Sequence, residues 1–128
     1  MIVTDWSPYA PYFTRDEFAC KHTGKCEMQS HFMDRLLALR IEYGKPMRIS
    51  SGFRDVTHPK ESRKAATGEH PRGVCCDVAV EGIDALRLLQ LALRHGFSRI
   101  GVNQKGAVRF LHLGVGDTGL PNPAIWSY

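Results

Sequence analysis

The chain has 128 residues, 43% of them hydrophobic, which is enough for one packed core. It contains no repeat, no low-complexity segment and no apolar run near the roughly 18 residues of a membrane span. The net charge of +4 would suit an anionic partner, but the basic residues are scattered rather than clustered, which disfavours nucleic acid. We therefore expect one monomeric domain over residues 1–128 that binds no nucleic acid.

The first local signals lie near the N-terminus. Residues 1–12 include two prolines but neither a basic start nor an apolar core, so they do not predict a secretory signal peptide. We therefore expect cytoplasmic synthesis, with phage-type or other assisted delivery if the target is a cell wall. Residues 14–17 have the form of a capping box, flanked by Phe13 and Phe18 in the positions of a hydrophobic staple. They predict a short helix that ends within residues 20–25.

The middle of the chain predicts a helix, a strand and a long loop. Residues 30–43 place apolar side chains at helical spacing, and Gly44 ends the pattern. Residues 47–50 predict a short strand. Residues 54–68 are polar and have no period, and a loop of this length in a compact domain is often functional.

The second half predicts two strand regions around a helix. Residues 74–80 alternate as a strand does. Residues 84–95 predict a helix with leucines over so much of its surface that we expect it to be well buried. Residues 99–102 and 108–115 predict a hairpin. We expect residues 116–128 to be a tail that packs on the domain and is irregular over 121–128. This order of elements indicates an α+β fold with a mostly antiparallel sheet.

Three polar residues in or beside these strands suggest a metal site. Asp77 lies in the middle of an apolar strand, where an unpaired carboxylate is costly to bury. His112 lies within the apolar run 108–113, and His70 precedes Asp77 by seven residues. Two imidazoles and a carboxylate suit zinc, and a catalytic zinc site uses three protein ligands and one open position. His70, Asp77 and His112 are therefore candidate ligands of one catalytic zinc ion.

Simpler roles remain open for the same residues. A histidine in a strand is more often a hydrogen-bonded core residue than a ligand, and Asp77 can instead pair with Arg54 or Arg109. Spacing by itself does not decide between these roles and a metal site.

A combination of motifs resembles peptidase family M15. These are Ser-Gly-Phe-Arg at 51–54, His58, the pattern His-x-x-Gly-x-x-x-Asp at 70–77, and Phe-Leu-His at 110–112. The resemblance spans about residues 13–115 and is strongest to the branch of zinc D-alanyl-D-alanine carboxypeptidases and phage-like murein peptidases. It implies a small α+β zinc domain that cleaves peptidoglycan stem peptides.

The resemblance also implies a role for each matching residue. His70, Asp77 and His112 match the three zinc ligands. Arg54 matches the arginine that steadies the substrate carboxylate or the developing oxyanion. His58 matches a histidine near the substrate that supports the site.

The chain departs from the family pattern around the site. Three positions near the candidate ligands differ from the family pattern: a serine is replaced by Gly68, an alanine by Cys75 and an asparagine by Pro59. These changes remove neighbours that would help to orient the ligand side chains. The general base is the larger loss, because the positions before the last ligand hold Arg109 and Phe110, neither of which can accept a proton.

The base is missing from its other usual position as well. Many relatives carry an aspartate two residues after the last histidine. This chain has Gly114 at that position. Glu69, Asp117 and Glu81 are the remaining candidates, and the sequence does not choose among them.

The four cysteines indicate no disulfide framework. Cys75 and Cys76 are adjacent and poorly placed to bridge each other. Cys75 shares the strand face of Asp77, although packing is its simpler role. Cys20 and Cys26 can pair, stay reduced, or bind metal in a small knuckle with nearby histidines; its spacing matches no common zinc finger.

The leading hypothesis is a zinc-dependent metallopeptidase that acts on peptidoglycan, as a D-Ala-type carboxypeptidase or a murein endopeptidase. The first alternative is a non-catalytic, zinc-containing structural or wall-binding module of a phage on the same fold, which the missing base favours. The second is a nucleic-acid-binding domain, which the net charge suggests and the scattered basic residues oppose.

Overall fold

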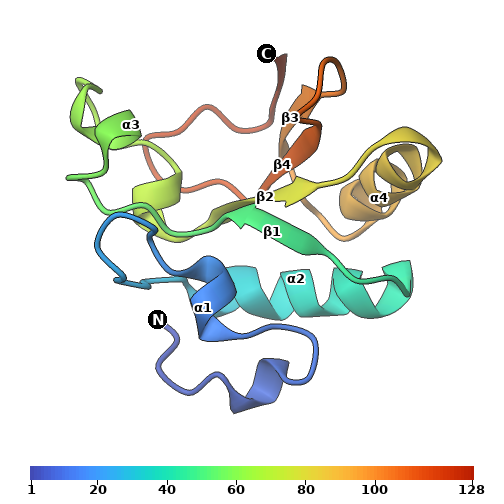
Figure 1. Ribbon diagram of the computed structural model, residues 1–128, viewed down its shortest axis with the longest axis horizontal. Helices are drawn as coiled ribbons and strands as arrows, with labels where there is room; N and C mark the ends of the chain where they lie inside the picture. Colours follow the sequence, from blue (N-terminus) through green and yellow to red (C-terminus); the bar gives the residue numbers. More distant parts are fainter.

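Five strands form one sheet in the order β1-β2-β4-β3-β5 (Figure 1). The computed structural model describes all residues from 1 to 128. The strands are β1 (Arg48–Ser51), β2 (Cys75–Ala79), β3 (Arg99–Asn103), β4 (Phe110–Gly114) and β5 (Ala124–Ser127). Only the β3–β5 pair is parallel. The predicted α+β fold with a mostly antiparallel sheet is confirmed.

Helices lie on both sides of this sheet. They are η1 (Ser7–Tyr9), α1 (Arg15–Phe18), α2 (Ser30–Tyr43), α3 (Pro59–Ser62), η2 (His70–Arg72) and α4 (Gly82–Arg94), where η denotes a 3-10 helix. In Figure 1, α2 and the N-terminal segment lie below the sheet, whereas α3 lies above it. None of these helices combines the length and the apolar character that crossing a membrane requires.

The two faces of the sheet have different chemistry because strand side chains alternate. Cys76, Val78, Leu111 and Leu113 point toward the core and are at most 1% exposed. They belong to one cluster with the buried side chains of α2 and α4. The opposite face carries Asp77 and the other polar residues of β2 and β4.

The local predictions hold best where a cap or a stop signal is present. In α1 the Thr14 N–H donates to Glu17 Oε2 at 2.7 Å, and the rings of Phe13 and Phe18 pack edge to face. This helix ends at Phe18, before the predicted range 20–25. Helix α2 has the predicted bounds and ends at Gly44, which has a φ of 75°.

Three predictions of local structure were wrong. The stretch 54–68 contains the short helix α3. Helix α4 is not buried all round, since Ile83, Leu86 and Leu93 are 75%, 55% and 57% exposed while a single stripe packs inward. The tail is not wholly irregular, because β5 pairs with the outer edge of β3. The backbone groups of that edge would otherwise lack partners within the sheet.

Gly73 links the short helix η2 to β2 and lets two segments approach closely. Its φ is 69°, and a Cβ at this position would overlap the carbonyl oxygen of Glu27. Its own carbonyl accepts a hydrogen bond from the Gln29 N–H at 2.9 Å. The tight approach anchors the segment that carries His70.

We predict that Gly73→Ala lowers the free energy of unfolding more than Gly82→Ala does. Both glycines have positive φ, which costs another residue about 1–2 kcal/mol. Only Gly73 would also clash, because Gly82 has nothing within 4 Å of its missing Cβ. Denaturant unfolding of the two variants measures the difference, and equal losses would contradict the close approach.

Candidate metal centre

One row of residues crosses the polar face of the sheet. Each of the five strands contributes one residue to this row. In the order of the strands across the sheet, β1-β2-β4-β3-β5, they are Ser51, Asp77, His112, Gly101 and Trp126. Asp77 and His112, which are 35 residues apart in the chain, thereby become direct cross-strand neighbours. Strand pairing therefore assembles the centre of the site.

His70 enters this row from the short helix η2. Its Nδ1 lies 2.8 Å from the carbonyl oxygen of Gly52. A carbonyl can only accept, so Nδ1 carries the hydrogen and Nε2 keeps a free lone pair. Nε2 lies 3.6 Å from Asp77 Oδ2. Burial lowers the pKa of His70 to about 4, so the ring is neutral at pH 7, as a metal ligand must be.

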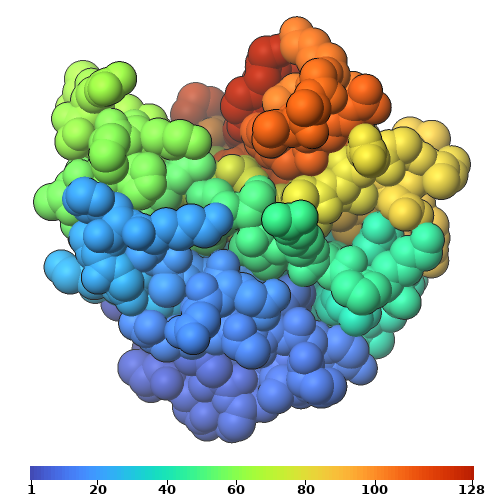
Figure 2. All heavy atoms as spheres, viewed as in Figure 1, coloured from blue at the N-terminus to red at the C-terminus, as the bar shows by residue number.

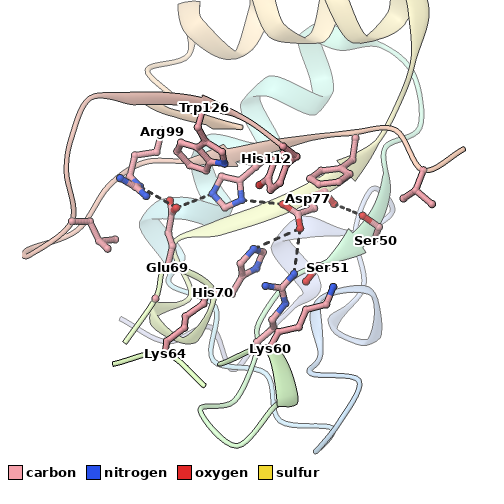
Figure 3. Close-up of a pocket in the computed structure, with 16 residues that line it drawn as sticks. Ser50, Ser51, Lys60, Lys64, Glu69, His70, Asp77, Arg99, His112 and Trp126 are labelled. Carbon is pink, nitrogen blue, oxygen red and sulfur yellow. Dashed lines mark hydrogen bonds and ion pairs between the residues drawn. The ribbon is translucent and has the colours of Figure 1, made fainter. Parts of the chain in front are cut away.

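His112 lies between two carboxylates (Figure 3). Its Nδ1 is 2.9 Å from Asp77 Oδ1, and its Nε2 is 2.7 Å from Glu69 Oε1. Burial by itself would lower the pKa of His112, but the hydrogen bonds to the two carboxylates outweigh it and raise the pKa. The ring therefore has a fixed orientation, with Nδ1 turned toward Asp77.

Arg54 completes the surroundings of Asp77. Its Nη2 lies 3.5 Å from Asp77 Oδ2, and its Nη1 donates to Glu61 Oε2 at 3.2 Å. Burial would raise the pKa of the Asp77 carboxyl, but the hydrogen bond from His112 and the nearby positive charges hold it below its ordinary value. Asp77 is thus an ionised carboxylate, and the pairing with Arg54 considered from the sequence is present.

The donor atoms around Asp77 fit a zinc ion. Zinc bonds of 2.0–2.1 Å in a tetrahedral arrangement place neighbouring ligand atoms about 3.3 Å apart. The separations of 2.9 Å from His112 and 3.6 Å from His70 to the Asp77 oxygens lie on either side of this value. Two imidazole nitrogens and a carboxylate oxygen are also the atoms that zinc prefers.

Cys75 offers a second donor set. One ligand atom each from His70, Cys75 and His112 lie within 4.8 Å of one another, and all three residues are buried. Burial raises the pKa of the Cys75 thiol well above its ordinary value, so without a metal it is a neutral thiol. The sequence placed Cys75 on the same strand face as Asp77, where it could lie near a metal, but favoured a packing role for it. The structure therefore contains a buried cluster with His70 and His112 in common and either Asp77 or Cys75 as the third donor.

The cluster opens into a cavity of about 680 Å³. Lys60 and Lys64 lie on one side of this cavity and Trp126 on the other (Figure 3), and Phe110 and Tyr128 also line it. Figure 2 shows the corresponding hollow between the segment around α3 and the C-terminal part of the chain. The cluster is thus accessible to a ligand from outside.

Trp126 forms a wall of the cavity beside His112. The two ring centroids are 5.0 Å apart, and the Arg99 guanidinium lies 5.1 Å from the indole ring centre. A Cβ at Gly101 would come within 2.6 Å of the Trp126 Nε1. Gly101 therefore leaves the space that the indole fills.

His58 is the one predicted site residue that lies apart from the cavity. Its Nδ1 accepts a hydrogen bond from the Lys60 N–H at 3.1 Å, at the start of helix α3. That helix carries Glu61, which binds Arg54. Any effect of His58 on the site therefore passes through α3.

The three candidate bases differ sharply in position. Glu81 and Asp117 have side chains that are 71% and 43% exposed, pair with Arg109 and Arg72, and do not line the cavity. Glu69 does line it and contacts His112, but its Oε2 is buried without a hydrogen-bond partner. Glu81 and Asp117 are thus outside the cavity, and in Glu69 one oxygen contacts His112 and the other is buried.

Comparison with models of known protein families shows to which family the chain belongs. A family model described as Peptidase M15 matches residues 11–114, most of the chain. The chain belongs to the peptidase M15 family. This is a family of hydrolases of the peptidase class, which implies a peptide substrate. All the candidate ligands lie within the M15 match, whereas β5 lies beyond it. No match is found among curated proteins.

Arg99 is a residue that the sequence analysis missed. Its Nε lies 2.9 Å from Glu69 Oε1, and its side chain is only 11% exposed. It shares the face of His112 because it pairs with Gly114 across the β3–β4 ladder. Alternation could have placed Arg99 on this face, but its partner Glu69 comes from a segment that no local pattern connects to β3.

Metal content separates the two donor sets. We predict that wild-type protein retains one zinc ion per chain, that Asp77→Ala and His112→Ala lose it, and that Cys75→Ala retains it. The physical reason is that Asp77 carries a negative charge at neutral pH whereas Cys75 does not. Elemental analysis after dialysis measures the zinc, with circular dichroism as the control for folding. Full zinc in Asp77→Ala together with loss in Cys75→Ala would establish the sulfur-containing set instead.

Proposed function

We propose that this M15 domain is a zinc-dependent metallopeptidase that hydrolyses a peptide bond in peptidoglycan stem peptides, next to a D-alanine. The observation that carries this proposal is the convergence of His70 Nε2 and His112 Nδ1 on the ionised carboxylate of Asp77, at 3.6 and 2.9 Å. These three residues would hold the ion. Bound zinc supplies Lewis-acid chemistry, which polarises a carbonyl and makes water a nucleophile near neutral pH.

The cavity suits an anionic peptide. Lys60 and Lys64 both line it; Lys60 makes no ion pair, and Lys64 pairs with Glu61 but has 45% of its side chain exposed. Stem peptides carry free carboxylates, which these ammonium groups can bind. The aromatic wall that includes Trp126 offers an apolar surface for the methyl groups of alanine residues.

Arg54 is placed to act on the reacting group. Its guanidinium is held from two sides by Glu61 and Asp77, and its side chain is 14% exposed, so its orientation is set before a substrate arrives. A preorganised cation of this kind stabilises negative charge that develops on a carbonyl oxygen, or holds a substrate carboxylate. His58 contributes to this arrangement through the start of α3.

The second candidate is a non-catalytic zinc module that binds the cell wall. The lack of a base favours it, since Arg109, Phe110 and Gly114 occupy the positions where relatives carry one. A positioned base adds roughly 10²–10⁴-fold to a rate, so an enzyme without one would be slow but measurable.

An assay on purified peptidoglycan distinguishes the two candidates. We expect the zinc-loaded protein to release new amino termini or free D-alanine, detected by mass spectrometry, and a chelator to abolish the release. The Asp77→Ala variant is the matched inactive control. A zinc-loaded protein that binds peptidoglycan and releases nothing over a long incubation would establish the binding module and refute the peptidase.

We predict that Arg54→Ala lowers kcat/KM on such a substrate by about 10²–10³-fold, the usual cost of one preorganised donor to a developing oxyanion. Arg109→Ala is the matched control, because Arg109 is exposed and pairs with Glu81 outside the cavity. Both variants should retain zinc. Equal activities of the two variants would exclude the proposed role of Arg54.

A further inference from the structure

Glu69 occupies an unusual place beside the site. It is 6% exposed and directly precedes His70 at the start of η2. Its Oε1 is 2.7 Å from His112 Nε2 and 2.9 Å from Arg99 Nε (Figure 3). A carboxylate with so little contact with water costs free energy unless its partners compensate. Here Oε2 has no hydrogen-bond partner at all, so the position of this group is not explained by pairing alone.

The same carboxylate fills the side-chain space of another residue. Gly114 lies on β4, two residues beyond His112 and on the same face of the sheet. A Cβ built on Gly114 would overlap Glu69 Oε2. The carboxylate thus lies where a side chain at position 114 would begin, although it is delivered from a different segment of the chain.

The contact with His112 determines which ring nitrogen is free. The Glu69 carboxylate accepts a hydrogen from Nε2, and a metal ion bound between Nδ1 and Asp77 would replace the hydrogen on Nδ1 and use its lone pair. Nδ1 is the nitrogen that faces Asp77 at 2.9 Å. A ligand histidine whose other nitrogen donates to a carboxylate has both its tautomer and its orientation fixed.

We propose that Glu69 is the positioning residue for His112, and that Gly114 is required because the Glu69 carboxylate occupies its side-chain space. Glu69 acts through His112 and not on the substrate. The inference rests on the proposed function in one respect, which is that His112 is a zinc ligand. The competing explanation is that Glu69 only forms an ion pair with Arg99 and contributes to stability.

A double-mutant cycle of Glu69→Ala and Gly114→Ala tests the proposal. Removing a group that orients a ligand typically weakens metal binding about 10–100-fold, and we expect this loss of zinc affinity in Glu69→Ala. Gly114→Ala should cause a similar loss, because its methyl group displaces the Glu69 carboxylate. In the double variant the second substitution should add little. Glu69→Gln, whose amide oxygen still accepts from Nε2, should recover much of the affinity.

Competition with a chromophoric zinc chelator measures these affinities, and denaturant unfolding measures the stability of each variant. Zinc affinities that stay at the wild-type value in folded Glu69→Ala would overturn the proposal and leave Glu69 as the partner of Arg99. Full additivity of the two losses would also overturn it, because the two positions would then act independently.

A readout without zinc separates this inference from the proposed function. The ¹⁵N signals of the His112 ring in metal-free protein report which nitrogen carries the proton and its hydrogen bonds. We expect Glu69→Ala and Gly114→Ala to change the Nε2 signal in the same way. A wild-type protein that binds no zinc would refute the proposed function, while unchanged ring signals in both variants would refute the Glu69 contact.

Discussion

The contact between Asp77 and His112 across β2 and β4 is the interaction on which the site depends. The ionised carboxylate is only 6% exposed, and removing one partner of a buried charged pair typically costs 3–5 kcal/mol. His112 contacts one oxygen of this carboxylate, and His70 and Arg54 approach the second oxygen. Such a cluster is costly to keep in a small domain. The proposed metal site would account for their convergence there.

The sheet keeps this cluster apart from the hydrophobic core. Alternation directs Cys76 and Val78 toward α2 and α4, while Asp77 between them faces the cavity. The close approach at Gly73 holds the His70 segment against residues 27–29. The rigid core and this anchored turn together set the distances between the candidate ligands, which the chemistry of a metal site requires within a few tenths of an ångström.

The chain belongs to the M15 family although it departs from the family pattern near the site, and the structure shows how both can hold. The candidate ligands are in place, whereas the positions of the usual base hold residues that cannot accept a proton. Glu69 fills the space left by Gly114, but its contacts direct it to His112 rather than into the cavity. A carboxylate beside the site can therefore orient a ligand without acting as a base.

Much of the fold could be predicted from local patterns. The capping box at Thr14, the stop at Gly44 and the alternation around Asp77 each depend on residues close in sequence, and each predicted its element to within a few residues. The exposed leucines of α4 and the strand formed by the tail were missed. Which side of a helix is buried, and which edge of a sheet is open, depends on packing partners that no local pattern contains.

The sequence by itself determined the chemistry available to this protein, which is two histidines and an aspartate in or beside apolar strands, at spacings that resemble M15. Only the tertiary structure decided what surrounds them. Cys75 joined the donor cluster, Arg99 and Glu69 met beside His112, and Trp126 closed one side of the cavity. These residues come from separate segments, and strand register and loop packing bring them together. Register is a non-local property, because it depends on how whole strands pair across the sheet.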